Sequence, residues 1–427
     1  MTASTSTITT AIGGLDRIRA DLADFYRDLH MHPELSGAEH RTAQQVAEQV
    51  AALGYQVTTG VGGTGVVAML ANGNSPTVLL RADFDALPIT EATGLPYASR
   101  NDGVMHACGH DMHATCLLGA LHLLAGARST WSGTIMAIFQ PAEETGRGAQ
   151  GMVDDTLFER FGKPDIVLAQ HTAPFPVGLI AGHPGVAAAA TDALRVTLHG
   201  HGGHGSRPEV TVDPVVLAAA TVMRLQTIVS REIAANDAAV VTVGSMRAGT
   251  KDNIIPDDAE LQLNIRTYTP EVRQRVLSAV DRIIKGEAAA AGAVRAPEIS
   301  VIDTFPVMNN DPDALHRTLT AIGEILGPDH VFDPGRITGS EDAGIFATSA
   351  GVPLCYWMFG VLSLAQFGGT DPVQIVRDVL TGRIDPKSVP GPHTAKYFPE
   401  VDPSITAGVT AMVTAALTWL GSAAPMA

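Results

Sequence analysis

Three short apolar runs constrain the fold more strongly than any other feature of the sequence. They span residues 77–80, 134–139 and 166–169, and they lack the polar/apolar alternation of a strand with one solvated face. Such runs are typical of parallel strands that are buried on both faces. A fourth run of the same kind spans residues 353–359. The sequence therefore predicts an α/β fold with a mostly parallel sheet.

Acidic and imidazole side chains follow the first three runs. Asp85 comes shortly after the first run, Glu143 and Glu144 follow the second, and His171 follows the third. Because the carboxyl ends of the strands in an open α/β sheet form the crevice where ligands bind, we expect these side chains to converge. Pro141 ends the second strand, and a loop there can aim both neighbouring carboxylates inward.

The segment 106–113 holds a thiol and three imidazoles, namely Cys108 with His106, His110 and His113, directly before an apolar stretch that predicts a helix. Zinc and its borderline-soft neighbours bind sulfur and imidazole nitrogen, so this mixture indicates Zn, Mn, Co or Ni. The positive end of the helix dipole is expected to help keep Cys108 as thiolate. The competing interpretation is a buried thiol beside a capping histidine.

The middle of the chain has a different pattern. Half-buried strands and helices follow one another in the order βαββαβ, which is typical of a split-βαβ, ferredoxin-like domain. Because the α/β pattern resumes after about residue 306, this region is predicted to be an inserted domain. We expect the two parts of the catalytic domain at residues 1–186 and 305–427, and the inserted α+β domain at residues 187–304.

Composition argues against several classes of function. The 427 residues carry a formal net charge of −16 with a pI near 5.3, which opposes binding to nucleic acid or to an anionic membrane. The three cysteines give no disulfide framework and suit the cytoplasm. Residues 1–10 lack the features of a signal peptide, and residues 403–427 predict a buried helix in preference to a membrane span. We expect a cytoplasmic protein with a small-molecule partner.

Two local features carry structural predictions. After a first helix at residues 15–30, Ser36 and Glu39 match the capping-box pattern at the start of a second helix. The stretch 60–65 fits the letters of the dinucleotide motif G-x-G-x-x-G, but a strand-like stretch follows it where the motif needs a helix. We therefore interpret it as a turn between strands.

Several short motifs occur in one order along nearly the whole chain. They are Leu29-His30 with Pro33-Glu34-Leu35-Ser36, Arg81 to Pro88, His106 to His113, Phe139 to Glu144, Gly202-Gly203-His204, Asn253 to Pro256, and Ser340-Glu341-Asp342. Together they resemble the M20 metallopeptidase clan, specifically its amidohydrolase branch of hippurate hydrolases, N-acyl-amino-acid amidohydrolases and auxin-conjugate hydrolases. The resemblance implies a zinc-peptidase-like catalytic domain, and an inserted domain that acts as a lid and forms a homodimer.

The resemblance also implies a site for two divalent metal ions, with Mn, Zn, Co and Ni as the candidates. The implied ligands are Cys108, His110, Glu144, His171 and His393, and Glu143 is the implied general acid/base. His393 departs from the family pattern, because about thirty residues separate it from the preceding strand and Thr394-Ala395 follow it. A surface-loop histidine therefore stays open as an alternative.

Amide hydrolysis explains why such residues are needed. An amide is a weak electrophile with a poor leaving group, so the reaction needs hydroxide near neutral pH and a proton for the departing nitrogen. Two divalent ions lower the pKa of a bridging water, and Glu143 can take its proton and pass it to nitrogen. Asp85 is expected to accept a proton from a ligand histidine. The predicted reaction is hydrolysis of N-acyl or N-aroyl amino acids.

Three residues of the inserted domain have roles by resemblance. His204 would stabilise the oxyanion at the site of the partner subunit, while Asn253 and Arg266 would bind the substrate's carboxylate. Each has an ordinary alternative, which is a histidine in a glycine-rich turn, a turn-forming asparagine and an outward-facing strand arginine, respectively.

Four further residues flank the predicted site. His106 and His113 are expected to support the ligands and not to bind metal. Glu341 and Asp342 are either groups that support the ligands or a helix cap, and the sequence does not choose between these.

Alternative functions also stay open. Cys108 could be the nucleophile of an amidase together with His110 and Glu143, in which case no metal is needed. The protein could instead be a catalytically silent metal-binding protein or, within the clan, a dipeptidase or carboxypeptidase. The long segment 361–392, in which a helix near residues 372–380 is predicted, is expected to shape acyl selectivity because it immediately precedes His393.

Overall fold

The computed structural model describes residues 4–74 and 76–422, and the chain divides into two compact units. Unit 1 contains the residues up to 187, residues 309–335 and the residues from 342 onward. Unit 2 contains residues 188–308 and 336–341. The predicted inserted domain, 187–304, therefore falls close to the main segment of unit 2, whereas the short segment 336–341 was assigned to the catalytic domain by the sequence.

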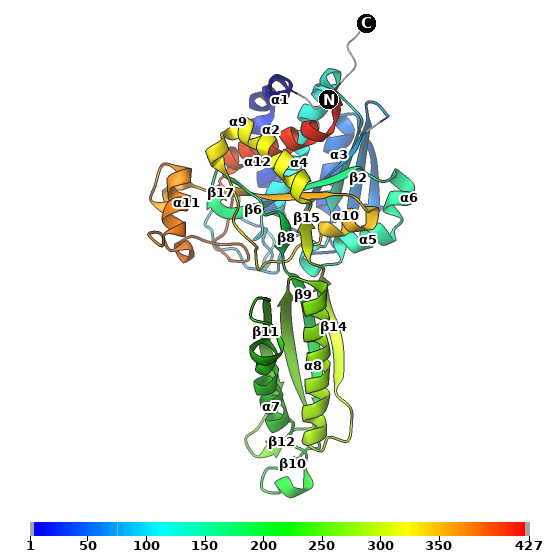
Figure 1. The fold of residues 1–427 in the computed structure, drawn as a ribbon, viewed down its shortest axis with the longest axis vertical. Coiled ribbons are helices and arrows are strands. Elements are labelled where there is room, and N and C mark those ends of the chain that lie inside the picture. Colours follow the sequence, from blue (N-terminus) through cyan, green and yellow to red (C-terminus); the bar gives the residue numbers. More distant parts are fainter. Residues whose placement is uncertain (1–3, 75, 423–427) are drawn as a thin grey trace. The chain divides into compact units, whose positions relative to one another are not determined.

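An eight-stranded sheet forms the centre of unit 1 (Figure 1). Its order is β1 (Gln56–Val61), β2 (Gly65–Ala71), β5 (Thr134–Gln140), β3 (Thr77–Asp83), β6 (Ile166–Pro176), β17 (Leu354–Leu362), β7 (Ile180–Ala181) and β16 (Val331–Phe332). β3 runs parallel to β5 and β6, and β17 runs parallel to β6. The four apolar runs are thus the central parallel strands, which confirms the predicted α/β class.

Helices pack on this sheet to make the core of unit 1. The longest are α2 (Leu15–Met31), α3 (His40–Ala52), α4 (His110–Gly126), α9 (Pro312–Leu326) and α12 (Val401–Trp419), and α12 packs against α2, α4 and α9. α12 is the predicted buried C-terminal helix, although residues 423–427 of that prediction lie outside the described residues. Within the described chain, no helix combines the length and apolarity that crossing a membrane requires.

Smaller elements complete this unit. They are α1 (Thr5–Ile12), α5 (Gly148–Asp154), α6 (Leu157–Phe161), α10 (Gly344–Ala350), α11 (Pro372–Leu380), β4 (Trp131–Ser132) and β18 (Gly421–Ser422). The helix expected near residues 372–380 is α11, whereas α1 was not predicted. The strands β8 (Gly185–Ala188) and β15 (Met308–Asn310) lie where the chain passes from one unit to the other.

Unit 2 is an antiparallel four-stranded sheet with two helices packed on it. The sheet order is β11 (Ala239–Ala248), β13 (Asp258–Thr267), β9 (Ala190–His199) and β14 (Glu298–Phe305), and the helices are α7 (Pro214–Thr227) and α8 (Pro270–Ala290). Along the chain these elements follow the predicted βαββαβ order. A separate two-stranded antiparallel sheet of β10 (Gly203–His204) and β12 (Ile254–Ile255), which are distant in the sequence, is added to it.

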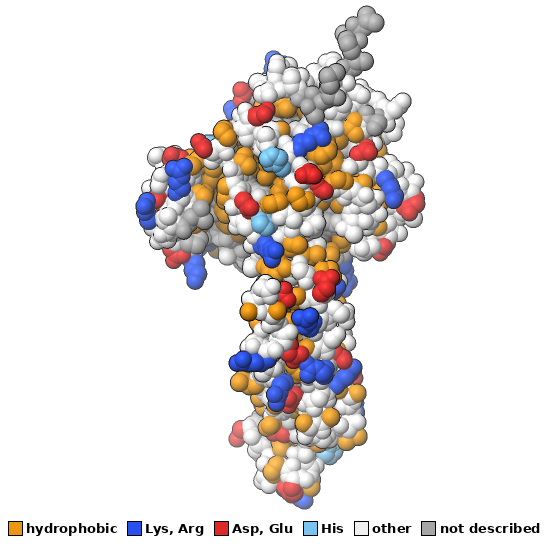
Figure 2. Space-filling view, viewed as in Figure 1, with side chains coloured by type: hydrophobic (Ala, Val, Ile, Leu, Met, Phe, Trp, Pro, Cys, Tyr) orange, Lys and Arg blue, Asp and Glu red, His pale blue; other side chains and the backbone are white. Residues whose placement is uncertain are grey.

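Several large apolar side chains of unit 2 remain exposed. On α7 these are Val216 and Met223, with 64% and 71% of their surface exposed, and on the edge strand β11 they are Val240 and Met246. Orange apolar atoms are visible among the charged side chains of this unit in Figure 2. Exposed edge strands and large apolar side chains are features that proteins usually cover, so α7 and β11 are suited to contact another chain.

Two local predictions have different outcomes. The stretch 60–65 is a turn between the antiparallel strands β1 and β2, as expected. The capping box is wrong: α3 begins at His40, and its first amides, those of Arg41 and Thr42, donate to the Glu34 carboxylate at 2.9 and 2.8 Å. Ser36 and Glu39 contact other parts of the chain, because their side chains face the site described below.

Candidate metal centre

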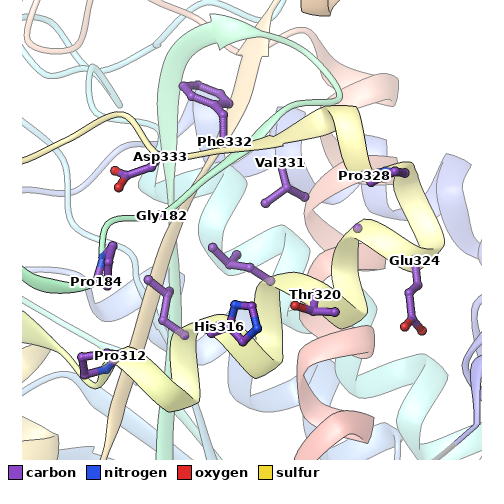
Figure 3. A pocket seen from close by; sticks show the side chains of 13 residues that line it. Gly182, Pro184, Pro312, His316, Thr320, Glu324, Pro328, Val331, Phe332 and Asp333 are labelled. Atoms are coloured by element: carbon purple, nitrogen blue, oxygen red, sulfur yellow. The ribbon is translucent and has the colours of Figure 1, made fainter.

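Unit 1 contains two candidate ligand sites whose lining residues differ in chemistry. A groove of about 550 Å³ lies along α9 (Figure 3), and Leu315, Leu319, Val331 and Phe332 are among the residues that line it. Its wall is mainly apolar. The predicted metal ligands gather instead beyond the carboxyl ends of the central strands, as parallel-sheet geometry requires.

The five predicted ligands come from four separate parts of the chain. Cys108 precedes α4 and His110 is its first residue, Glu144 lies in the short 3-10 helix η2 (Glu143–Thr145) after β5, His171 lies in β6, and His393 lies in the loop before α12. Gly109 has a φ of 85°, and a Cβ there would lie 2.5 Å from Thr172 Oγ1. Only glycine therefore fits between Cys108 and His110.

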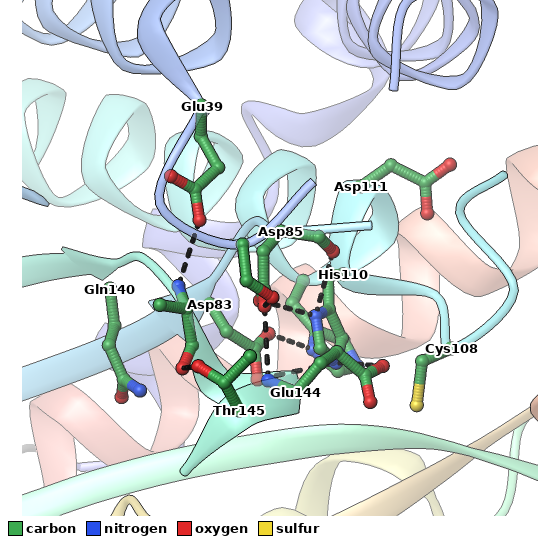
Figure 4. Close-up of polar contacts among 12 residues, drawn as sticks. Glu39, Asp83, Asp85, Cys108, His110, Asp111, Gln140, Glu144 and Thr145 are labelled. Atoms are coloured by element: carbon green, nitrogen blue, oxygen red, sulfur yellow. Dashed lines mark hydrogen bonds and ion pairs between the residues drawn. The ribbon is translucent and has the colours of Figure 1, made fainter. Parts of the chain in front are cut away.

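Short distances link all five of these side chains, of which Cys108, His110 and Glu144 are labelled in Figure 4. Cys108 Sγ lies 3.6 Å from His171 Nε2, His110 Nε2 lies 3.8 Å from Glu144 Oε1, and His393 Nε2 lies 3.4 Å from Glu144 Oε2. Cys108, Glu144 and His393 also form one group whose ligand atoms lie within 4.8 Å of one another. His393 is at the rim, with 55% of its side chain exposed, while the other ligands are buried or nearly so.

The donor atoms of this cluster fit divalent cations. His110 Nε2 and Glu144 Oε1 are buried and have no hydrogen-bond partner within the described residues, although they face each other. Burial raises the pKa of Glu144 to about 7, and burial together with Glu144 raises the pKa of the Cys108 thiol well above its ordinary value. A cation between His110 Nε2 and Glu144 Oε1 would bind both atoms, and it would favour the anionic forms of Glu144 and Cys108. The expected contribution of the helix dipole to the ionisation of Cys108 stays a prediction.

Asp85 orients one ligand and holds the turn that carries another. Its Oδ1 lies 3.1 Å from His110 Nδ1, so this ring nitrogen donates to Asp85 and Nε2 is left to bind metal. Its Oδ2 accepts hydrogen bonds from Ser36 Oγ at 2.6 Å and from the Glu144 amide at 3.0 Å. The carboxylate thus accepts a proton from His110, as expected, and also supports the turn that carries Glu143 and Glu144.

The turn after β5 brings two neighbouring carboxylates to the same imidazole. β5 ends at Gln140, and Ala142 adopts the left-handed region with φ 49°. Glu143 and Glu144 then occupy η2, where both lie in one 4.8 Å group with His110. Gly148 closes the turn, because a Cβ at this position would lie 1.6 Å from the Pro141 carbonyl oxygen.

A buried ionic network beneath the site was not predicted from the sequence. Arg81 is fully buried and pairs with Asp83 at 2.8 Å and with Asp342 at 3.2 Å, while its Nε donates to Gln140. Asp342 also accepts from Gln140 Nε2 at 2.7 Å and from the Ala149 amide at 3.1 Å. Asp342 is thus a support group. The signal in the sequence was an arginine inside an apolar strand, since a buried charge requires partners.

His106 and His113 lie beside the ligands. His113 Nδ1 contacts Asp83, and its Nε2 accepts from the Thr172 amide at 2.7 Å, so neither nitrogen is available to a metal. Burial lowers the pKa of His113 to about 3 and that of His106 to about 4. Both rings are therefore neutral. His106 is fully buried and has no hydrogen-bond partner in the described part of the chain.

The predicted residues of unit 2 lie at opposite ends of that unit. His204 is exposed on β10 and its Nδ1 accepts from the Ser206 amide at 3.1 Å, and the neighbouring Gly205 amide donates to the Asn253 carbonyl. Arg266 is near the end of β13, where its Nη1 donates to the Thr338 carbonyl at 2.6 Å. Arg266 is eight residues beyond the start of β13 at Asp258, a separation of about 27 Å along the strand. The structure brings His204 and Asn253 together, but not with Arg266.

Comparison with known proteins places the chain in a family. Residues 79–372 match the model of peptidase family M20/M25/M40. The chain is 37% identical to hippurate hydrolase of Campylobacter jejuni, over 77% of this chain and 85% of the relative. It is 36% identical to thermostable carboxypeptidase 2 of Saccharolobus solfataricus, over 78% of this chain and 84% of the relative.

A solved structure shares the fold. It is the YXEP protein of Bacillus subtilis, described as a dinuclear metal binding peptidase of the M20 family, with a TM-score of 0.70 and 27% identity over 94% of this chain and 99% of that one. The fold and the site define the class of metal-dependent hydrolases that have a mainly parallel α/β catalytic domain. The chain belongs to peptidase family M20, which confirms the resemblance found in the sequence.

Proposed function

We propose that this protein is a metal-dependent amidohydrolase that cleaves N-acyl and N-aroyl amino acids into an acid and an amino acid. The observation that carries the proposal is the convergence of Cys108, His110, Glu144, His171 and His393 beside Glu143. The similarity to a hippurate hydrolase supports this substrate class, because hippurate is an N-aroyl amino acid.

Each residue has a role in the proposed reaction. Two divalent ions, held by the five ligands, would supply Lewis acidity and a water of lowered pKa. Glu143 takes a proton from water and returns it to the departing nitrogen, since its carboxylate lies in the same 4.8 Å group as His110 and Glu144. Asp85 holds His110 in the tautomer that presents Nε2.

Recognition of the substrate is assigned to unit 2. Arg266 and Asn253 bind the carboxylate, and His204 donates to the oxygen of the attacked carbonyl. Because Arg266 lies about 27 Å along the strand from the His204 end of unit 2, the two cannot meet one substrate within a single copy. His204 and the neighbouring Asn253 therefore act together at the site of a second subunit, whose own Arg266 binds the carboxylate of the same substrate. The exposed apolar residues of α7 and β11 supply a surface for such a homodimer.

The alternatives fit the site less well. A nucleophilic cysteine needs a lowered thiol pKa, whereas burial and Glu144 raise that of Cys108. A carboxypeptidase activity is favoured by one relative's name and needs the same carboxylate recognition, so it is the second candidate. We assign acyl selectivity to the segment 361–392, whose helix α11 contacts β6, the strand that carries His171.

The proposed location is the cytoplasm. Cys108, Cys116 and Cys355 are all free and buried, as is usual in a reducing compartment. On the face shown in Figure 2 acidic and basic side chains are interspersed, and we propose small molecules as the substrates in place of nucleic acid or lipid.

Restoration of activity after metal removal tests the proposal. The protein is stripped with a chelator, reloaded separately with Mn, Co, Ni or Zn, and assayed with hippurate, N-acetyl amino acids and dipeptides. We expect no turnover without metal and turnover of the acylated amino acids after reloading. Full activity of the stripped protein, or cleavage of the dipeptides alone, contradicts the proposal.

A further inference from the structure

Glu39 is a buried carboxylate that does not form the predicted capping box and has no part in the proposed reaction. It is fully buried, and its side chain contacts three groups. Oε1 accepts from the Gly37 amide at 2.8 Å and from the Ala142 amide at 2.9 Å, and Oε2 accepts from Thr64 Oγ1 at 2.6 Å. The contact of Glu39 with the Ala142 amide can be followed in Figure 4.

Capping of α3 does not explain this carboxylate. Glu39 immediately precedes the helix but makes no side-chain bond to it, and the first helix amides that need an acceptor are bonded to Glu34. Burial raises the pKa of Glu39 although its three hydrogen bonds lower it, so the buried charge costs free energy. Because the Glu39 carboxylate costs free energy and does not cap α3, we expect its role to lie in its other contacts.

One contact of the Glu39 carboxylate is with the Ala142 amide, in the turn that carries Glu143. Ala142 has the left-handed φ of 49°, which is unfavourable for a residue with a side chain, and this conformation aims the following carboxylate. Two residues on, the Glu144 amide donates to Asp85 at 3.0 Å. Two buried carboxylates from distant segments therefore hold the amides on either side of Glu143.

We propose that Glu39 is a positioning residue for the general acid/base: its Oε1 holds the Ala142 amide and thereby fixes the direction of the Glu143 side chain. Glu39 does not touch the reacting atoms or any of the proposed ligands. The inference rests on the proposed function, since it assigns Glu143 the proton transfer. Loss of the contact is expected to impair the chemical step while leaving metal binding and substrate binding in place.

The experiment compares three substitutions of Glu39. Glu39→Ala removes the acceptor, and we expect kcat to fall about 10²-fold with KM within about threefold, since misplacement of a catalytic group by about 1 Å has this effect. Glu39→Gln keeps an oxygen for the two amides and offers an NH2 group to the Thr64 hydroxyl, so kcat is expected to stay within about threefold of the unaltered protein. Glu39→Asp keeps the charge but withdraws it by one methylene, and an intermediate kcat is expected.

Glu34→Ala is the matched control, because it also removes the acceptor of two backbone amides in the same region without touching the turn. We expect it to lower Tm at least as much as Glu39→Ala and to leave kcat unchanged. In the cobalt-loaded protein, the absorption of the Cys108 thiolate-to-metal band reports the ligand set. This band is expected to be the same in all of these variants.

Three results overturn the inference. They are a kcat of Glu39→Ala within about threefold of the unaltered protein, a loss in Glu39→Gln as large as in Glu39→Ala, and a loss in Glu34→Ala that matches Glu39→Ala at equal Tm. If Glu39→Ala does not fold, the test is the comparison of the other two variants, in which kcat should be lower for Glu39→Asp than for Glu39→Gln. Failure of the proposed function is recognised separately: a fully active Glu143→Gln removes the proton-transfer role whatever Glu39 does.

Discussion

The cluster of predicted ligands in unit 1 and the residues of unit 2 that we propose to bind substrate differ in how completely a single chain assembles them. In unit 1, the strands β5 and β6, the start of α4 and the loop before α12 bring the five predicted ligands together, and buried groups such as Asp85 and Arg81 hold their surroundings. In unit 2, His204 and Asn253 are exposed at one end, and Arg266 at the other end donates to a backbone carbonyl.

The difference shows which part of the site one copy of the chain can complete. Parallel strands that end at one edge make a site that needs no partner, because the sheet itself fixes the geometry. If residues at both ends of the unit 2 sheet contact one substrate, as we propose, two copies of the chain must take part. We therefore expect the metal centre to form within one chain and substrate recognition to depend on a dimer.

The largest effect is expected for Glu143→Gln. Because Gln cannot accept the proton, kcat should fall by about 10³-fold or more, while two ions remain bound to each chain. Steady-state kinetics and metal analysis of the same preparation measure both quantities. Glu159→Gln, an equal loss of charge on the exposed side of α6, is the control and should be fully active. Loss of metal from Glu143→Gln would instead make this residue a ligand.

His204→Ala tests whether recognition involves two chains. We expect kcat to fall about 10²-fold through loss of one oxyanion donor, with the metal content unchanged. Mixing it with Glu143→Gln after dissociation should restore about a quarter of full activity, since half of the dimers are mixed and one of their two sites is intact. His201→Ala, in the same loop, should not lose activity. If mixing restores nothing, His204 does not act across subunits.

Sequence reasoning predicted the parts of the molecule that depend on periodic pattern and on strand ends. Apolar runs identified β3, β5, β6 and β17, and the residues that follow them led to Glu143, Glu144 and His171. The βαββαβ order of unit 2 was read in the same way. These features depend on residues that are close together in the sequence, so the amino-acid sequence alone is enough to recognise them.

Long-range support could not be read from the sequence. Glu39 matched a capping box by its letters, yet its carboxylate reaches the Ala142 amide 103 positions away. Asp342 bonds Gln140 across 202 positions, which left its role open. The partner of a carboxylate that accepts from a backbone amide cannot be recognised in the sequence, because every residue except proline has such an amide.

Met223→Glu is expected to weaken the dimer. Met223 is 71% exposed on α7, and a charge placed in an apolar contact should raise the dimer Kd at least about 30-fold. Sedimentation over a concentration series measures this change, and activity should fall in parallel because His204 is lost from the partner's site. Val294→Glu, at a residue 95% exposed beyond α8, is the control. An unchanged dimer would exclude α7 from the interface.

The smallest effect is expected for Arg266→Lys. Lysine keeps the charge but loses the planar fork, so KM for an acylated amino acid should rise about tenfold at constant kcat. Arg195→Lys on β9, where the side chain is 51% exposed and pairs only loosely with Glu260, should change neither constant. A fall in kcat at constant KM would assign Arg266 to the chemical step.

Cobalt titration of the metal-stripped protein tests the central claim most directly. Hydrolysis of hippurate and the thiolate-to-cobalt absorption band are followed together, in the unaltered protein and in Cys108→Ser. The account predicts that both signals appear only with metal, that binding saturates at two ions per chain, and that the band is missing from Cys108→Ser. Hydrolysis without added metal, or a band that survives in Cys108→Ser, would contradict it.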